Sequence, residues 1–409
     1  MIVSVTKPDL MDNPSSRPQI QLRAGAHRRA THGHPWIYSN EVMMDAGAKA
    51  LAAGTPVTVM TASGQSLGVW AFNPAPLISA RLLDRKSETR IDRSFLAARL
   101  AQALALRTRL FDQPYYRLIH AEADALPGLI VDRYNDILVV QQNAAAVDIL
   151  RQPLLEALQE ILSPRTIILR NDSATRLLEG LAQREIEVIG DQPPNPLPLL
   201  ENNIHYFADA LSGQKTGWFF DQRPNRAALA AVAQGATVID YYCYGGGFAI
   251  AMLKSGAKHA IGVDRSDTAL ALATKAAEAN HLAEKFTAHR SETFADMEGR
   301  AARGENFDIV NADPPAFAKT RKDLPMALRG YRKLARLATK LVAPKGLLHI
   351  ASCSHHVGLP EFIEVVSSGI ADTDRPARIL RIGGAGPDHP IHPLLPESAY
   401  LKSLLLQVD

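Results

Sequence analysis

Residues 238–249 read VIDYYCYGGGFA. The apolar pair before Asp240 is typical of a buried strand that ends in a carboxylate. Gly245, Gly246 and Gly247 then permit a tight turn into a helix, whose free backbone N–H groups favour negative charge. This order of strand, turn and helix predicts either a ligand-binding loop or an ordinary structural turn, because a glycine triplet alone does not distinguish the two.

A second acidic residue, Asp264, favours the ligand-binding alternative. It ends the next apolar run, 24 residues after Asp240, where a carboxylate can accept two hydrogen bonds from a ribose diol. The dinucleotide fingerprint G-x-G-x-x-G does not occur in the chain. The pattern therefore indicates a nucleoside-containing ligand that is held without that fingerprint.

Strands and helices alternate from about residue 200 onward. We expect strands at 236–241, 260–263, 308–312 and 347–352, and helices at 268–280 and 327–341. This alternation predicts an α/β fold with a parallel sheet covered on both faces. Ligands of such sheets bind beyond the carboxyl ends of the strands.

Two of these strand ends carry residues suited to chemistry. Asp313 is followed by Pro314 and Pro315, which cannot extend a strand and which push Asp313 toward an extended conformation. The next strand ends beside Cys353, so neighbouring strand ends place Asp313 and Cys353 at one predicted pocket. The alternatives are a plain strand-to-loop break at the prolines and a buried, unreactive cysteine.

The first half of the chain shows a different pattern. Short β-like runs at 56–59, 67–70 and 77–82 predict a small β-barrel or sandwich. An α+β block follows, with helices expected at 90–110 and 147–162 and strands at 128–132, 136–141, 166–170 and 186–189. Four prolines within residues 191–198 mark a boundary. We therefore divide the chain into a loose tail at 1–17 and domains at 18–88, 89–199 and 200–409.

Composition excludes several classes of protein. The chain has 409 residues, of which 46% are hydrophobic and 21% charged, values typical of soluble globular proteins. No apolar run is long enough for a membrane span, and the first 17 residues lack a secretory apolar region. Two cysteines exclude a disulfide framework and a four-cysteine zinc site, so we expect a cytoplasmic protein.

Basic residues gather near the start of the chain. The net charge is only +3, but no acidic residue occurs between Arg17 and His34, a stretch that holds Arg23, Arg28 and Arg29. Such a cluster is either a solvated basic face or a surface for a polyanion.

Taken together, Asp240, the glycine triplet, Asp264 and the Asp313-Pro314-Pro315 motif resemble the S-adenosylmethionine site of class I methyltransferases. The closer resemblance is to the bacterial RlmI-like family of large-subunit rRNA cytosine-C5 methyltransferases, which carry an N-terminal PUA domain. It extends over nearly the whole chain from about residue 18. The matching stretches are residues 34–37, 122–129, 213–223, 388–397 and 400–402.

The resemblance implies a PUA-like RNA-binding barrel, a central α+β domain and a C-terminal Rossmann-like methyltransferase domain. It implies S-adenosylmethionine as cofactor, 23S rRNA as partner, and a homodimer. The lack of a long apolar run leads us to expect no membrane partner. The cofactor-binding candidates are Asp221, Arg223, Asp240, Tyr244, Gly245, Gly246, Gly247, Phe248, Asp264, Arg265, Glu292, Asp313 and Pro314. The RNA-binding candidates are Arg23, Arg28, Arg29 and Phe317.

Two positions depart from the pattern of class I sites. Tyr244 stands where a glycine is common, and Glu292 stands where an aspartate usually contacts the adenine amine. Arg223 is a candidate partner of the methionine carboxylate, with an ordinary ion pair as the alternative.

The resemblance implies covalent catalysis by Cys353. Its thiolate would add to carbon 6 of cytosine and make carbon 5 electron-rich, while Asp313 stabilises the adduct at N3. His355 is one candidate for the base that removes the C5 proton. Cys243 is expected to pack in the core, and we expect no metal.

The aromatic residues have two interpretations each. Tyr244, Phe248, Phe317 and Tyr331 are candidates for stacking on a flipped base or for core packing. In the first domain we expect Trp36, Tyr38 and Trp70 to be core residues.

Two other functions stay open from the sequence. One is methylation of a different base atom without a covalent step, and the other is a catalytically silent RNA-binding assembly factor that keeps the fold.

Overall fold

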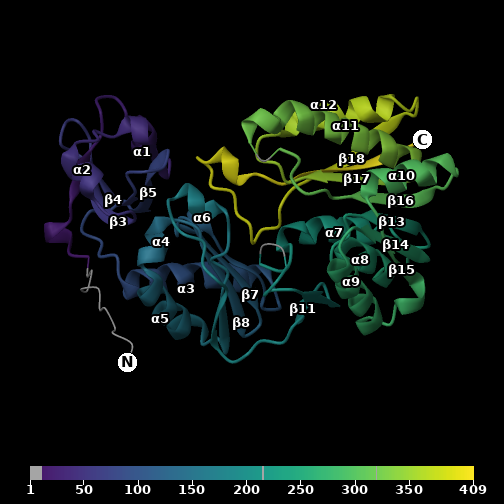
Figure 1. Ribbon diagram of the computed structural model, residues 1–409, viewed down its shortest axis with the longest axis horizontal. Helices are drawn as coiled ribbons and strands as arrows, with labels where there is room; N and C mark the ends of the chain where they lie inside the picture. The colour runs from purple at the N-terminus through teal and green to yellow at the C-terminus, as the bar shows by residue number, and fades with distance from the viewer. Residues whose placement is uncertain (1–11, 214–215, 319) are drawn as a thin grey trace. The chain divides into compact units, whose positions relative to one another are not determined.

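The computed structural model describes residues 12–213, 216–318 and 320–409 (Figure 1). Gln214 and Lys215, which belong to the matching stretch 213–223, therefore lie outside the described residues. The chain forms two compact units. The first unit comprises residues up to Pro193 together with residues 390–396, and the second comprises residues 194–389 and 397–409. The division falls within the proline-rich stretch 191–198, where the sequence predicts a boundary. The finer division into three domains stays a prediction.

The N-terminal part of the first unit is a five-stranded sheet in the order β1-β3-β4-β5-β2. Its strands are β1 (Gln19–Gln21), β2 (Trp36–Tyr38), β3 (Thr55–Met60), β4 (Ser66–Phe72) and β5 (Ile78–Asp84), with short helices α1 (Arg28–Thr31) and α2 (Ala46–Ala50). The three strands predicted here are confirmed. Trp70 is buried in the core of this sheet as predicted, whereas Trp36 and Tyr38 are only half-buried.

A second sheet of the first unit has the order β10-β9-β8-β7-β6. Its strands are β6 (Tyr115–His120), β7 (Leu129–Tyr134), β8 (Ile137–Gln142), β9 (Thr166–Leu169) and β10 (Glu187–Gly190). The helices are α3 (Arg93–Leu110), α4 (Ala145–Ile149), α5 (Arg151–Leu162) and α6 (Thr175–Leu178). Asp92 caps α3 by accepting a hydrogen bond from the Phe95 N–H at 3.1 Å.

One predicted helix of this unit is wrong in detail. The sequence predicts a continuous helix over 147–162, but the structure has α4 and α5, separated at Leu150. Pro153 explains the break, because its ring would clash with the carbonyl of Ile149 in a continuous helix.

The second unit contains a seven-stranded sheet in the order β15-β14-β13-β16-β17-β19-β18. The strands are β13 (Thr237–Tyr241), β14 (His259–Asp264), β15 (Phe286–Arg290), β16 (Phe307–Ala312), β17 (Val342–Ser352), β18 (Ala377–Gly383) and β19 (Lys402–Val408). The four predicted strands pair in parallel as expected. The sheet also contains strands that the sequence analysis does not predict, among them β19, which runs antiparallel to both β17 and β18.

Helices cover both faces of this sheet (Figure 1). On one face lie α7 (Arg223–Ala230), α8 (Gly247–Lys254) and α9 (Asp267–Ala279), and on the other α10 (Thr293–Ala302), α11 (Leu324–Lys340) and α12 (Leu359–Ala371). A hairpin of β11 (Leu197–Glu201) and β12 (Ile204–Ala208) packs against α9. Among the described residues, no helix combines the length and the apolar character that crossing a bilayer requires.

Candidate active site

The predicted site residues of the second unit lie at the carboxyl edge of its sheet. Asp240 is the fourth residue of β13, Asp264 ends β14, Asp313 follows β16 and Cys353 follows β17. These strands are parallel neighbours, so their carboxyl ends meet at one edge. The structure therefore gathers residues that are up to 113 positions apart in the chain.

The loop after β13 has an unusual backbone. Tyr242, Tyr244 and Gly246 have φ angles of 61°, 47° and 75°, a left-handed region that is costly for residues other than glycine. The Tyr244 hydroxyl donates to the carbonyl of Gly217 at 3.1 Å. This contact fixes the tyrosine that stands at a position where class I sites commonly have glycine.

The glycines of this loop are required by packing within the chain. A Cβ atom at Gly246 would lie 2.9 Å from the Cβ atom of Ala273, and one at Gly245 would lie 3.3 Å from the Trp218 ring. Close contact with α9 and with Trp218 therefore requires these glycines, in addition to any close approach of a ligand.

Asp240 forms hydrogen bonds both to the first turn of α8, which follows the loop, and to the neighbouring strand β16. It is fully buried, and its carboxyl group accepts hydrogen bonds from the Ala249 N–H at 3.0 Å and from the Asn311 amide at 2.6 Å. Burial raises the pKa of Asp240 to about 7, although both hydrogen bonds oppose the shift. Asp240 thus fixes the start of α8 against β16.

The buried polar contacts continue to β17. The Asn311 carbonyl oxygen accepts a hydrogen bond from His349 Nδ1 at 2.6 Å. Burial, assisted by the charge of Arg381, lowers the pKa of His349 to about 3, so the ring is neutral at physiological pH. The Phe248 ring is buried with its centroid 5.3 Å from that of His349, which places this predicted cofactor residue in the core.

Asp264 is oriented toward the loop after β13. Its Oδ2 atom accepts from the Tyr244 N–H at 3.1 Å and its Oδ1 atom accepts from the Ser266 N–H at 2.9 Å. The side chain is half-buried, and each carboxylate oxygen has a second lone pair that can accept a hydrogen bond from a ribose hydroxyl. Arg265 is exposed beside it, and Glu292 is exposed at the start of α10.

The segment before α7 supplies a contact that the sequence analysis missed. The Gln222 side-chain amide donates to Asp313 Oδ2 at 2.8 Å. Asp221 accepts from the Tyr400 hydroxyl at 2.5 Å, and Arg223 forms an ion pair with Glu201 at 3.4 Å. Gln222 belongs to the stretch 213–223 that carries the family resemblance, which was the available signal.

Cys353 and the Asp313 segment come together as predicted from their strand ends. The Cys353 Sγ atom lies 4.0 Å from the Pro314 carbonyl oxygen, and both Cys353 and Asp313 are half-buried. Pro314 itself is buried. At adjacent strand ends, a thiol can act as a nucleophile and a carboxyl group can act as an acid on the same substrate ring.

The serines on either side of Cys353 point inward. The Ser352 hydroxyl donates to the Tyr331 hydroxyl at 2.8 Å, and the hydroxyl groups of Tyr331 and Ser354 are 3.0 Å apart. Tyr331 is fully buried, so it is a core residue and cannot stack on a base. Phe317 is half-buried with its ring centroid 4.7 Å from that of Tyr331.

Cys243 lies in the core, as expected. Its side chain is buried, and burial raises the pKa of its thiol well above the usual value. A thiol in such surroundings is unreactive. Of the two cysteines, only Cys353 is partly accessible.

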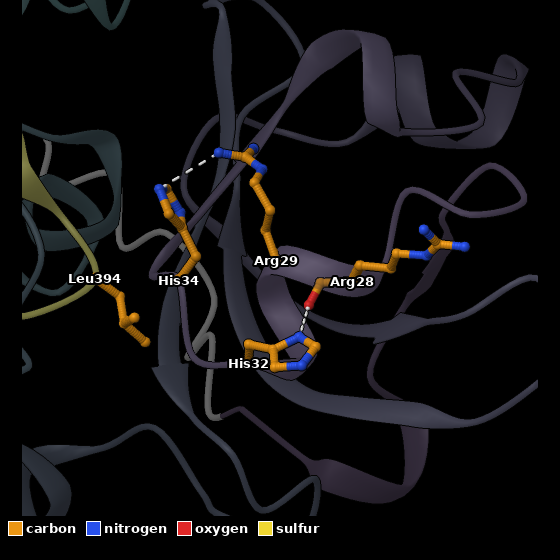
Figure 2. Close-up of a pocket in the computed structure, with 5 residues that line it drawn as sticks. All are labelled: Arg28, Arg29, His32, His34 and Leu394. Atoms are coloured by element: carbon orange, nitrogen blue, oxygen red, sulfur yellow. Dashed lines mark hydrogen bonds between the residues drawn. The ribbon is translucent and has the colours of Figure 1, made fainter.

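Basic residues on and just after α1 line a cavity of about 260 Å³ in the first unit (Figure 2). It is lined by Arg28, Arg29, His32, His34 and Leu394. The Arg29 guanidinium donates to both carboxylate oxygens of Glu41, at 3.0 and 2.9 Å. Arg28 and Arg23 are exposed. The acidic partner of Arg29 therefore comes from just beyond the acid-free stretch that the sequence analysis noted.

Comparison with known families and proteins agrees with this geometry. Residues 20–85 match the PUA-like domain family, and residues 179–407 match the S-adenosylmethionine-dependent methyltransferase family. Ribosomal RNA large subunit methyltransferase I of Tolumonas auensis is 36% identical over 95% of this chain and 98% of that protein. The protein of the same name from Aeromonas hydrophila is 35% identical over the same shares.

Solved structures share the fold. A methyltransferase complexed with SAH has a TM-score of 0.82 and 19% sequence identity, covering 95% of this chain and 100% of that chain. A chain from Streptococcus mutans has a TM-score of 0.80 and 20% identity, over the same shares of both chains.

Proposed function

Because the chain belongs to the ribosomal RNA large subunit methyltransferase I family of S-adenosylmethionine-dependent methyltransferases, we propose that it methylates carbon 5 of a cytosine in 23S rRNA through a covalent adduct with Cys353. The observation that carries the proposal is the half-buried Cys353 thiol beside Pro314, next to the Asp313 carboxyl group. Methylation at a nitrogen or oxygen atom would have no use for this thiol.

The residues at the sheet edge fit S-adenosylmethionine, which supplies the methyl group on a sulfonium when it is bound. Asp264 offers carboxylate oxygens suited to ribose hydroxyls, and the N-terminus of α8 lies directly after the loop that Asp264 contacts. We assign cofactor binding to the residues predicted from the sequence, with Asp240 and Phe248 acting from the core. Arg223 would bind the methionine carboxylate by exchanging its contact with Glu201.

The reaction proceeds in four steps on the cytosine ring. The Cys353 thiolate forms a bond to carbon 6, and Asp313 stabilises the ring at N3 by donating or sharing a proton. Carbon 5 then takes the methyl group and loses its proton to a base, for which His355 remains one candidate. The bond between Sγ and carbon 6 finally breaks and returns the thiolate. Gln222 orients the Asp313 carboxyl group for this role.

The first unit would position the RNA. We propose that Arg23 and Arg28 contact phosphates, with Arg29 contributing less because Glu41 already pairs with it. Phe317 would contact the target base. We also propose a homodimer, which the family resemblance supports, and action in the cytoplasm, which the presence of only two cysteines supports. The three-domain division at 18–88, 89–199 and 200–409 is likewise part of the proposal.

The test is incubation with 23S rRNA fragments that contain 5-fluorocytosine. We expect a covalent protein–RNA adduct that resists denaturing electrophoresis and that is lost in Cys353→Ala. The C5 fluorine cannot leave as a proton does, so the adduct is trapped after methyl transfer. Full methylation by Cys353→Ala would rule out the covalent mechanism.

Two other outcomes identify the alternatives. Methyl transfer without an adduct would indicate an exocyclic amine as the target. No binding of S-adenosylmethionine by calorimetry, with no change in Asp264→Ala, would indicate a catalytically silent RNA-binding factor. Mapping the methyl group by mass spectrometry of rRNA nucleosides would identify the nucleotide.

A further inference from the structure

A buried lysine lies next to the proposed nucleophile. Lys402 begins β19 and pairs in register with Ser352, the residue before Cys353. Only 6% of Lys402 is exposed. Lysine is rarely buried to this extent, because removing an ammonium group from water is costly.

The ammonium group of Lys402 is hydrogen-bonded to the backbone of Ser354, the residue that follows Cys353. Lys402 Nζ donates to the Ser354 carbonyl at 2.6 Å and to the Tyr400 carbonyl at 2.9 Å. Both acceptors are neutral, so these hydrogen bonds hold the group without cancelling its charge. A positive charge is thus fixed at the carbonyl of Ser354, the residue directly after Cys353.

Lys402 and Cys353 also interact electrostatically. Burial lowers the pKa of Lys402 to about 8, whereas the negative charges of Cys353 and Glu361 raise it. At pH 7 the lysine is therefore still mainly an ammonium ion. Other titratable groups near the pair include Tyr331 on α11, whose pKa burial raises, Asp313 after β16, and the exposed His355, two residues after Cys353.

We propose that the Lys402 ammonium stabilises the thiolate of Cys353 and so prepares it for attack before RNA binds. The inference rests on the proposed function, because it assigns Lys402 as a positioning residue for that nucleophile. The thiol proton passes to solvent, and elimination from carbon 6 regenerates the thiolate beside the same ammonium. A thiolate is the reactive form of cysteine, and nearby cations increase its population.

The test measures alkylation of Cys353 by iodoacetamide as a function of pH in the protein without RNA. Peptide mass spectrometry separates Cys353 from Cys243. In Lys402→Met we expect the midpoint of the rate profile to rise by about one pH unit or more, which corresponds to about a tenfold slower reaction at pH 6.5. Lys402→Arg keeps the charge and should remain within a few-fold of wild type.

Lys333→Met is the matched control, because Lys333 pairs with Glu298 at 3.0 Å on the surface of the same unit. It should leave the profile unchanged. An identical profile in wild type and in folded Lys402→Met would overturn the proposal.

A reciprocal measurement covers the case in which Lys402→Met does not fold. Linkage requires that, if the ammonium stabilises the thiolate, the thiolate raises the pKa of Lys402 by the same free energy. NMR of lysine labelled with ¹³C at Cε should show the Lys402 signal titrating at lower pH in Cys353→Ala, with the signal identified by its loss in Lys402→Arg. An unchanged titration would contradict the proposal.

Neither measurement uses RNA or the 5-fluorocytosine adduct. A shifted thiol profile without an adduct would therefore reject the proposed function while keeping the charge interaction. An adduct with unshifted profiles would reject only the role of Lys402.

Discussion

An amide from a distant part of the chain contacts the carboxyl group of Asp313. Gln222 donates to it at 2.8 Å across a sequence separation of 91 residues. Asn225 in turn donates to the Gln222 side-chain oxygen at 2.7 Å, which fixes the orientation of the amide. A carboxyl group that stabilises one ring nitrogen depends on such orientation, because misplaced catalytic groups lose rate steeply.

Gln222→Leu removes this hydrogen bond while keeping a side chain of similar size. Removing one partner of a buried hydrogen bond costs about 1–3 kcal/mol, so we expect kcat for methyl transfer to fall by about 10- to 100-fold. Affinity for S-adenosylmethionine, measured by calorimetry, should change only a few-fold. Gln152→Leu, which removes a surface contact with Glu156, is the control. Full activity of Gln222→Leu would contradict the role.

At the scale of residues, the sequence could place Asp313 and Cys353 at neighbouring strand ends but could not predict the contacts around them. A proline pair after an acid, or a cysteine at a strand end, is a local pattern. Gln222 and Lys402 are ordinary residues until the fold brings them to Asp313 and to Ser354. The same holds for Glu41, which changes the interpretation of Arg29.

The central strands are joined by one row of polar side chains. Asp240, Asn311 and His349 are register partners on β13, β16 and β17, and hydrogen bonds of 2.6 Å link each to the next. All three are buried. A buried polar network of this kind is stable only while its protonation state is preserved.

His349 makes this row sensitive to acid. Its pKa of about 3 in the folded chain lies below the usual value of 6.5, so the unfolded chain binds more protons between these values. This contribution to stability is present above pH 6.5 and is lost as the pH falls toward 3. Between pH 7.5 and pH 5 the contribution of His349 to the free energy of unfolding should fall by about 2 kcal/mol. Asp240, whose pKa is raised to about 7, contributes in the opposite direction over this range, so the His349 contribution is measured as the difference between a His349 variant and wild type.

His349→Asn should abolish that loss, because its amide can still donate to Asn311 but does not titrate. Urea unfolding at the two pH values measures the difference between the variant and wild type. His205→Asn, at an exposed position on β12, should retain the wild-type pH dependence. Equal acid sensitivity of His349→Asn and wild type would contradict the assignment.

At the scale of elements, periodicity located the four parallel strands because each is apolar and followed by a helix. It did not find β15, which is largely exposed, or the direction of β19. A continuous apolar run such as residues 402–408 indicates burial but carries no information about strand direction. Periodicity also did not predict the break at Leu150, because the apolar pattern continues through it. The break follows from the steric effect of Pro153 on the preceding turn.

At the scale of the whole molecule, the proposed RNA contacts and the proposed nucleophile belong to different units. The basic cluster around Arg28 belongs to the first unit, and Cys353 belongs to the second. Residues 390–396 belong to the first unit although the chain on both sides of them belongs to the second. The proline-rich stretch predicted the boundary near residue 193, but no local pattern predicts this return, because it depends on contacts between segments far apart in the chain.

Arg28→Ala should weaken RNA binding without affecting S-adenosylmethionine binding. If Arg28 neutralises one phosphate, the slope of log Kd against log salt should decrease by about 0.7–0.9. Binding of an rRNA fragment followed by fluorescence anisotropy at several salt concentrations measures this slope. Arg165→Ala removes an exposed arginine that pairs with Asp136 and should leave it unchanged. Equal slopes for Arg28→Ala and wild type would exclude a phosphate contact.

The position of β19 affects when the sheet of the second unit can form during synthesis of the chain. β19 is the last strand of its sheet in chain order, yet it lies in the interior between β17 and β18. Strands β17 and β18 therefore cannot join the same sheet until residues 402–408 have been synthesised and have left the ribosomal exit tunnel. Domains otherwise fold as they emerge during translation. A protein whose proposed substrate is ribosomal RNA would thus complete the sheet beside Cys353 only after residues 402–408 have emerged from a ribosome.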